Sequence, residues 1–319
     1  MTHRSILAVT DFSMEGHHAL NRAALLSAEH GSVLHLACFS DAAEAPPADA
    51  LIRLARHAQQ LSQKHGVVAR AASDLAHKVD DLLPAASAAD LVVWGTAPAS
   101  GLRSLIFGQP VEELIRRAQR PVLVARNGAT RPYRSLLVAV DLSGASRALV
   151  DASLSLNKAA RVELFHAIST ANEGKLRYAE VSDHAIRAYR EQCRRHARDR
   201  LFWLTDSYDA RRNRVQSTIA HGDAARQALV QQQRSGAELI VVGKHSASTF
   251  SEFLFGSVAS RLLNMSDVDG ARTDILVVPR DWRPAARRVR AGAPQIPTGS
   301  SPGPVPRPSS AAAAFRRAA

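Results

Sequence analysis

Residues 237–257 read AELIVVGKHSASTFSEFLFGS, an apolar run that ends on Gly243 and is followed thirteen residues later by a Gly-Ser pair. The apolar run is typical of a buried β-strand, and VASRLLN after Ser257 is typical of an amphipathic helix. A glycine at a strand end lets the backbone turn sharply, and the first amides of a helix lack internal partners and attract anions. The stretch therefore predicts a strand, a loop and a helix whose start binds an anion.

The chain repeats itself, which indicates a duplication. Four segments of the first half recur in the second half in the same order. They are SILAVTDFS (5–13) with SLLVAVDLS (135–143), ADLVVWG (89–95) with AELIVVG (237–243), LIFGQPVEEL (105–114) with FLFGSVASRL (253–262), and PVLVAR (121–126) with DILVVPR (274–280).

Each half alternates continuous apolar strands with helices, a pattern that predicts an α/β fold with a five-stranded parallel sheet covered on both faces. We expect domains at 1–127 and 134–282, joined by the linker RNGATRPY, and a disordered tail at 283–319. The predicted strands are 4–10, 33–39, 67–72, 90–95 and 121–126, then 134–140, 162–168, 214–220, 238–243 and 274–279. The predicted helices of the first half are 14–30, 48–65, 77–87 and 109–118.

A long helix is predicted at 174–204, and its apolar stripe runs at spacings of four. The stripe is Ala185, Tyr189, Cys193, Ala197 and Leu201. Arginines lie off the stripe and form a basic face that is either solvated or binds an acidic partner.

Composition limits the class of protein. The 319 residues carry a net charge of +12, and the predicted tail holds seven arginines and no acid. Such a tail attracts nucleic acid or anionic lipid weakly by charge, or stays solvated without a partner. The two cysteines share no metal or redox spacing, which fits a reducing cytoplasm. No apolar run approaches the length that spans a bilayer.

The predicted site of the second half lies beyond the carboxyl ends of its strands, where parallel sheets bind ligands. Gly243 ends one strand and Ser246 follows it, while Gly256 and Ser257 precede a helix. Asp141 ends the first strand of the same half and offers a carboxylate to a base or ribose. Together these residues predict a mononucleotide site.

The spacing Gly-x2-Ser-x9-Gly-Ser resembles the Gly-x2-Gly-x9-Gly-(Ser/Thr) pattern of the universal stress protein family, and residues 3–280 resemble two tandem UspA-type domains. The resemblance implies an adenine-nucleotide α-hydrolase-like fold, ATP with Mg in the second half, and pairing of 121–126 with 275–279 as a pseudo-dimer. The implied nucleotide residues are Asp141, Ala167, Gly243, Lys244, Ser246, Gly256, Ser257 and Val258.

The first half departs from that pattern and is predicted to hold a degenerate site. Pro98 replaces the second glycine and Gln109 replaces the Ser/Thr. Phe39 stands where the second half has Ala167, and it either crowds a base, stacks on it or fills the crevice with core. The matching residues of this half are Asp11, Phe39, Gly95, Pro98, Gly108 and Gln109.

Three functions follow, in order of preference. The first is a nucleotide-binding regulatory protein of the stress response, without catalytic residues and with slow hydrolysis at most. The second is a scaffold that acts through protein or apolar-ligand contacts. The third, an ATP-dependent enzyme, requires a Gly/Ser-rich motif after the first strand, which DFSMEGHH and DLSGASRA do not provide. No spacing of histidines or cysteines predicts a metal site.

Overall fold

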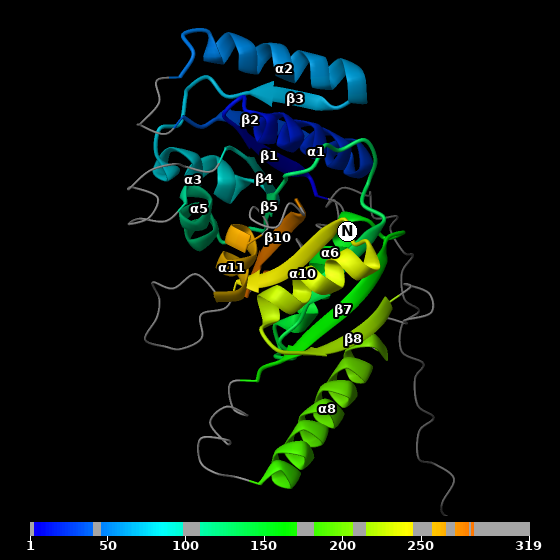
Figure 1. Cartoon of the computed structure of the whole chain (residues 1–319). Coiled ribbons are helices and arrows are strands. Elements are labelled where there is room, and N and C mark those ends of the chain that lie inside the picture. The colour runs from blue at the N-terminus through cyan, green and yellow to red at the C-terminus, as the bar shows by residue number, and fades with distance from the viewer. Residues whose placement is uncertain are drawn as a thin grey trace, which may run out of the picture. The chain divides into compact units, whose positions relative to one another are not determined.

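The computed structural model of the chain describes residues 3–40, 46–97, 109–170, 182–206, 215–244, 257–265, 272–280 and 282–283 (Figure 1). All of them lie within one compact unit, Met1–Ala285. The predicted tail lies outside the described residues except for its first residue, Arg283. No helix of the described part is long and apolar enough to cross a membrane.

The first half alternates strands and helices as its sequence pattern predicts. Its elements are β1 (Ser5–Thr10), α1 (Met14–His30), β2 (Val33–Cys38), α2 (Ala50–His65), β3 (Val68–Ala71), α3 (Val79–Ala88), β4 (Leu91–Gly95), α5 (Pro110–Ala118) and β5 (Val122–Val124).

The second half follows the same order with a longer second helix. Its elements are β6 (Ser135–Ala139), α6 (Ser146–Leu156), β7 (Arg161–Ile168), α8 (Asp183–Asp206), β8 (Val215–His221), α10 (Ala224–Ser235), β9 (Leu239–Lys244), α11 (Ser257–Met265) and β10 (Asp274–Pro279).

Both halves share one ten-stranded sheet, in the order β3-β2-β1-β4-β5-β10-β9-β6-β7-β8. Neighbouring strands are parallel within each half, and the last strands β5 and β10 pair antiparallel, with Leu123 opposite Leu276. This pairing gives the end strand of each half a partner, so neither backbone edge is left open there. Within each half the strand order reverses between β1 and β4, or between β6 and β9, which is where parallel sheets bind ligands.

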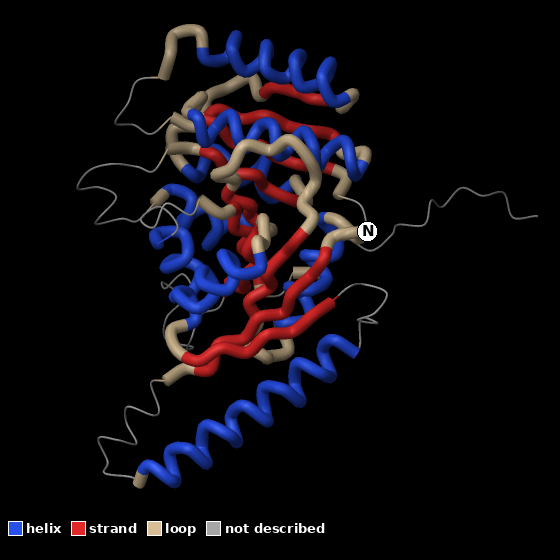
Figure 2. Tube along the Cα trace, turned by 45° about the vertical axis from the view of Figure 1, so that its right-hand side comes forward, coloured by secondary structure: helices blue, strands red, loops and turns tan. Residues whose placement is uncertain are grey.

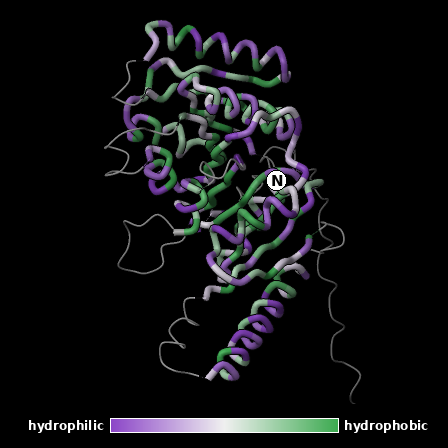
Figure 3. Tube along the Cα trace, in the orientation of Figure 1, coloured by the Kyte–Doolittle hydropathy of each residue, from purple (hydrophilic) through white to green (hydrophobic). Residues whose placement is uncertain are grey.

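Helices cover both faces of the sheet (Figure 2), because successive strand residues point to opposite sides. On one face, Ile6 and Ala8 join a core with α1, α2, α6 and α8. On the other face, Leu7 and Val9 join a core with α3, α5, α10 and α11. Figure 3 shows the resulting contrast between hydrophobic central strands and the mostly hydrophilic outer helices α2 and α8.

Side-chain caps fix where several helices begin. Ser13 accepts the amide hydrogen of Gly16 at 3.1 Å at the start of α1. Asp223 accepts that of Arg226 at 3.0 Å at the start of α10. Gly31 and Gly236, both at φ 65°, end the same two helices in the left-handed conformation that glycine adopts without strain.

The apolar stripe of α8 differs from the prediction at its amino end. Ala197 and Leu201 are buried as expected, whereas Ala185 is exposed and Ile186 is buried. Four steps of four residues rotate a position by about 160° around a helix of 3.6 residues per turn. A strict spacing of four therefore drifts off the core face, and the buried row moves to Ile186.

Candidate functional site

In each half the structure brings the predicted aspartate and the first predicted glycine to the carboxyl edge of the sheet. In the first half Thr10 of β1 lies opposite Gly95 of β4, and Asp11 follows at once. In the second half Ala139 of β6 lies opposite Val242 of β9, so Asp141 and Gly243 occupy the same edge. Both sites thus form where the strand order reverses.

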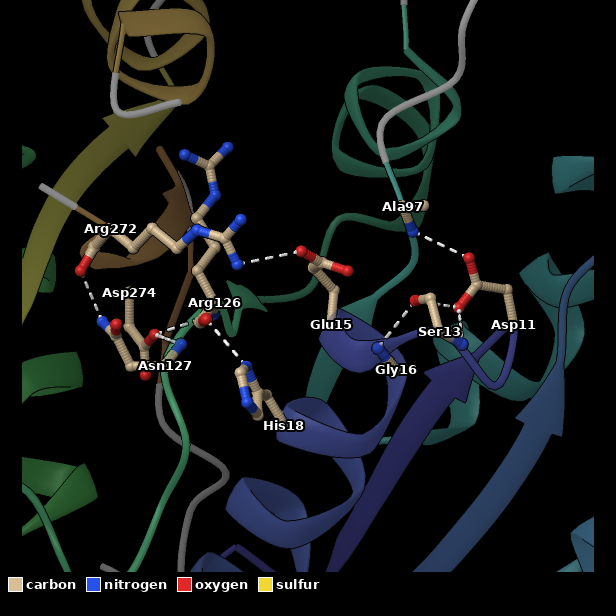
Figure 4. Close-up of polar contacts among 10 residues, drawn as sticks. All are labelled: Asp11, Ser13, Glu15, Gly16, His18, Ala97, Arg126, Asn127, Arg272 and Asp274. Atoms are coloured by element: carbon tan, nitrogen blue, oxygen red, sulfur yellow. Dashed lines mark hydrogen bonds and ion pairs between the residues drawn. The ribbon is translucent and has the colours of Figure 1, made fainter. Parts of the chain in front are cut away.

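In the first half the carboxylate of Asp11 is engaged by its own chain (Figure 4). Its Oδ2 accepts the amide hydrogen of Ala97 at 2.7 Å, and its Oδ1 accepts the amide hydrogen of Ser13 at 2.8 Å and the Ser13 hydroxyl. Because Ser13 also caps α1, Asp11 ties the loop after β4 to the start of that helix. The carboxylate of Asp11 therefore already accepts three hydrogen bonds from its own chain.

Gly95 is required by packing against α1. A Cβ at this position would lie 2.3 Å from the carbonyl oxygen of Glu15 and 2.4 Å from the Cβ of Ala19. Gly16 makes the matching approach from the helix, since a Cβ there would lie 2.3 Å from Thr10 Oγ1. The first half thus needs this glycine for its own fold, independently of any ligand.

Phe39 fills the crevice of the first half, one of the alternatives left open by the sequence. Its side chain is 5% exposed and its ring lies 5.3 Å from that of Trp94, which is 2% exposed. Both rings belong to the core under α3 and α5.

The start of α5 is also unfavourable to an anion. Gln109 is the N-cap residue without a side-chain cap, Pro110 has no amide hydrogen, and Glu112 and Glu113 lie in the first turn. Two carboxylates at the positive end of the helix already satisfy its dipole. Pro98 and Gly108 lie outside the described residues.

A cleft of about 190 Å³ remains beside this helix, at the contact between the halves. Its arginines already have partners on the protein. Arg272 forms an ion pair with Glu15 at 3.2 Å (Figure 4). Arg126 donates to the carbonyl of Leu263 at 2.6 Å. His18 meets the Arg126 carbonyl at 2.8 Å through Nδ1. The Arg272–Glu15 and Arg126–Leu263 contacts join the halves. The lining carboxylates Glu15 and Glu112 make the cleft unfavourable for phosphate.

The second half lacks the two rings that fill the first. Ala167 occupies the position of Phe39, and Val242 occupies that of Trp94. Ala167 is half-buried and lies opposite Ala220 of β8, and Ala139 of β6 is also half-buried. Together with Val258 of α11, these residues pack at the margin of the core. They form a small apolar floor that is partly open to solvent, which we call the alanine floor (Ala139, Ala167, Ala220 and Val258).

Comparison with known proteins identifies the fold. The sequence profile described as the universal stress protein family matches residues 2–126 and again residues 132–271. This chain belongs to the universal stress protein family. No curated protein matches it.

Solved structures agree with a tandem universal stress protein fold. A universal stress protein from Archaeoglobus fulgidus is 14% identical, with a TM-score of 0.60 over 86% of this chain and 96% of the other. A putative universal stress protein from Pseudomonas aeruginosa is 23% identical, with a TM-score of 0.60 over 87% and 93%. A universal stress protein solved with cAMP matches only 47% of this chain, with 22% identity, 98% of its own length covered and a TM-score of 0.30.

Asp141 is the exposed acid of the second-half site in this universal stress protein. Its Oδ1 accepts the amide hydrogen of Ser143 at 3.0 Å and the hydroxyl of Ser146 at 3.1 Å. These bonds orient the carboxylate at the edge of the sheet. Ser246, Gly256 and the side chain of Ser257 lie outside the described residues, and α11 begins at Ser257, one residue before the predicted start at Val258.

Lys244 lies at the contact between the halves. Its ammonium donates to the backbone carbonyl of Arg116 in α5, and burial, with the charge of Arg116, lowers the pKa of Lys244. A contact with phosphate would require this ammonium to leave Arg116. Its predicted part in nucleotide binding stays a prediction.

Two residues that matter to the site were missed by sequence reasoning. Both lie inside the repeated segments, where Trp94 aligns with Val242 and Glu112 aligns with Ser260. Comparing the repeats position by position, rather than only at the glycines, would have found both. The described residues contain no group of three or more metal-ligating side chains.

Proposed function

We propose that this universal stress protein is a regulatory protein that binds one adenine nucleotide, with ATP as the preferred ligand, in its second half. The observation that carries the proposal is the exchange of Phe39 and Trp94 for Ala167 and Val242 between the halves. Two large buried rings fill one crevice, whereas in the other Ala167 is half-buried and the smaller Val242 is packed in the core. An adenine ring fits a flat apolar floor of this kind.

The charge at the two helix starts supports the same choice. Glu112 and Glu113 occupy the first turn of α5, whereas the first turn of α11 has no acid. A helix start without carboxylates keeps its positive end available for phosphate. The triphosphate would therefore lie at α11, with the base over the alanine floor and the ribose near Asp141.

Magnesium would enter with the nucleotide. In the described residues no cluster of carboxylates gathers at this edge, so the phosphates themselves would supply most of the ligands. We expect binding without appreciable turnover, because the spacing of the second-half motif predicts nucleotide-binding residues and no catalytic residue.

Calorimetric titration of MgATP into wild-type protein and Ala167→Phe tests the proposal. The substitution gives the second half the side chain that fills the first, so the heat of binding should disappear. Ala185→Phe makes the same change at an exposed position of α8 and should leave the affinity unchanged. Absence of heat in wild type would favour the scaffold function instead, and equal binding by both variants would contradict the placement of the base.

A further inference from the structure

Helices α5 and α11 lie against each other where the halves meet (Figure 1). The hydroxyl of Ser260 in α11 donates to Glu112 Oε1 in α5 at 2.7 Å. Each helix returns antiparallel to the strand that follows it, and β5 and β10 are antiparallel, so α5 and α11 run in opposite directions. One turn along α5 from Glu112 is Arg116, and one turn back along α11 from Ser260 is the helix start. The last turn of α5 therefore lies beside the start of α11.

The first-half cleft shows the equivalent arrangement with the halves exchanged. Asn264 follows Arg116 by 148 residues, and Lys244 follows Thr96 by the same offset, which relates the repeated segments. Thr96 and Asn264 both line the cleft at the start of α5, although Asn264 belongs to the second half. Each half thus brings the last turn of its final helix to the site of the other half. Arg116 is the residue that the first half brings to the second-half site.

A direct contact also places Arg116 at that site. The ammonium of Lys244 donates to the backbone carbonyl of Arg116. Lys244 is the last residue of β9 and follows Gly243, the first glycine of the predicted nucleotide motif. A residue of α5 is therefore held at the carboxyl edge of the second-half sheet, the edge at which α11 begins.

The guanidinium of Arg116 lacks a counter-charge among the described residues. Its Nε is buried without a hydrogen-bond partner there, and no ion pair in the described part of the chain involves Arg116 or Lys244. The two acids of α5 have other partners, since Glu112 accepts a hydroxyl of α11 and Glu113 pairs with Arg117 at 2.8 Å. A buried nitrogen without a partner is unfavourable, and an anion beside it removes that penalty.

Arg116 and Lys244 form a positive pair that favours phosphate. Burial, followed by the charge of Arg116, lowers the pKa of Lys244, so the two cations lie close enough to repel. The acid of this site, Asp141, follows β6, and the sheet order places β6 on the side of β9 away from β5. The first turn of α11 has no acid, so the helix dipole adds to the positive field. Guanidinium groups bind phosphate oxygens through paired N–H donors.

We propose that Arg116 of the first half binds the phosphates of the nucleotide held by the second half, with Lys244 as the positioning residue that holds the end of α5 at the site. This inference rests on the proposed function. It gives the first half, whose own crevice is filled by Phe39 and Trp94, a part in binding the ligand of the other half. Because the guanidinium contacts phosphate and not the base, Arg116 favours ATP over adenosine.

Calorimetry on the full chain tests the part of Arg116 with MgATP titrated directly and adenosine measured by its competition with MgATP. Arg116→Gln should weaken MgATP about tenfold or more and change the affinity for adenosine less than twofold. Arg116→Lys keeps the charge without the paired donors and should lose less than Arg116→Gln. Arg117→Gln is the matched control, because it removes the neighbouring charge, which faces Asp80 and Glu113 of the first half, and should change both affinities less than twofold.

A double-mutant cycle tests the part of Lys244. Lys244→Met should weaken MgATP about threefold or more, and Lys244→Arg, which keeps a donor for the Arg116 carbonyl, should restore most of the affinity. In the Arg116→Gln background Lys244→Met should add less than twofold, because no guanidinium remains to be positioned. Fully additive losses would show that Lys244 contacts phosphate itself and would overturn its positioning part.

The outcomes separate this inference from the proposed function. Wild type that binds MgATP no more tightly than Arg116→Gln overturns the inference and leaves nucleotide binding in place. Wild type that does not bind MgATP overturns both. Equal losses for Arg116→Gln and Arg117→Gln, or for MgATP and adenosine, would also contradict a phosphate contact, since general charge or a damaged fold then explains the loss. Thermal unfolding by circular dichroism identifies a damaged fold, and Arg116→Lys then provides the comparison.

Discussion

Tyr133 donates its hydroxyl hydrogen to Asp274 Oδ2 at 2.5 Å, and both side chains are buried where the linker between the halves crosses β10. Oδ1 of the same carboxylate accepts the backbone amides of Arg126 and Asn127 at 2.8 and 3.0 Å. The guanidinium of Arg22 balances its charge at 3.5 Å and lies 3.7 Å above the Tyr133 ring. One carboxylate thus anchors the linker to both halves.

Tyr133→Phe should lower the free energy of unfolding by about 1–3 kcal/mol, because it removes a hydrogen bond to a buried charge while keeping the ring over Arg22. Asp274→Ala should cost more, about 3–5 kcal/mol, since it leaves Arg22 buried without its counter-charge. Urea unfolding measures both. In the double variant the two losses should not add, and full additivity would contradict a shared network.

Gly95→Ala should destabilise the protein by about 1–3 kcal/mol, because the new Cβ would overlap the backbone of α1. Gly128→Ala is the matched control, since a Cβ there would lie 3.6 Å from His18 in ordinary contact. Thermal unfolding monitored by circular dichroism compares the two variants. Equal melting temperatures would show that α1 does not constrain position 95.

Acid should destabilise the protein through His3. Burial lowers the pKa of His3 to about 4, from an ordinary value of 6.5, and the neighbouring His30 ring, 5.0 Å away, adds to the effect. The unfolded chain therefore binds this proton first, and stability is lost as the pH falls from 6.5 toward 4. Between pH 7.5 and pH 5 we expect a loss of about 2 kcal/mol from this residue.

The variant His3→Gln removes that titration, so its stability should depend less steeply on pH in urea unfolding over this range. Some dependence should remain, because burial also lowers the pKa values of His30, His57 and His65. An unchanged slope in the variant would assign the effect to the other histidines.

Nucleotide stoichiometry should be one per chain in wild type. Phe39→Ala removes one ring from the first half, yet the stoichiometry should stay at one, since Glu112 and Glu113 still oppose phosphate and Asp11 is still engaged. Calorimetry gives the number directly. A stoichiometry of two for this variant would show that the Phe39 ring alone prevents nucleotide binding in the first half.

Much of the fold could be predicted from local patterns. The family, the tandem repeat and the α/β class are confirmed, and the described strands begin and end close to the predicted limits. These features follow from continuous apolar runs, glycine stops and repeated segments, which are local in sequence. The predicted apolar stripe of α8 was wrong at Ala185. Positions four residues apart rotate gradually around a helix, and which of them face the core depends on where the sheet lies.

The candidate site was less accessible to sequence reasoning. Asp11 and Asp141 look alike in sequence, but Asp11 holds Ala97 across the crevice through a contact 86 residues apart in the chain. Lys244 follows a glycine in the sequence of the predicted phosphate loop, yet its ammonium contacts Arg116 of the other half. Such contacts join segments far apart in sequence, and no local pattern encodes them.

By itself, the sequence determined that the chain is two copies of one strand-and-helix unit, because hydrophobic periodicity and backbone preferences act over short distances. Only the tertiary structure decided that two rings close one crevice while small side chains line the other, and that an anchored carboxylate joins the halves. Packing and charge balance depend on which side chains lie in contact. The ten-stranded sheet brings segments that are far apart in sequence into such contact.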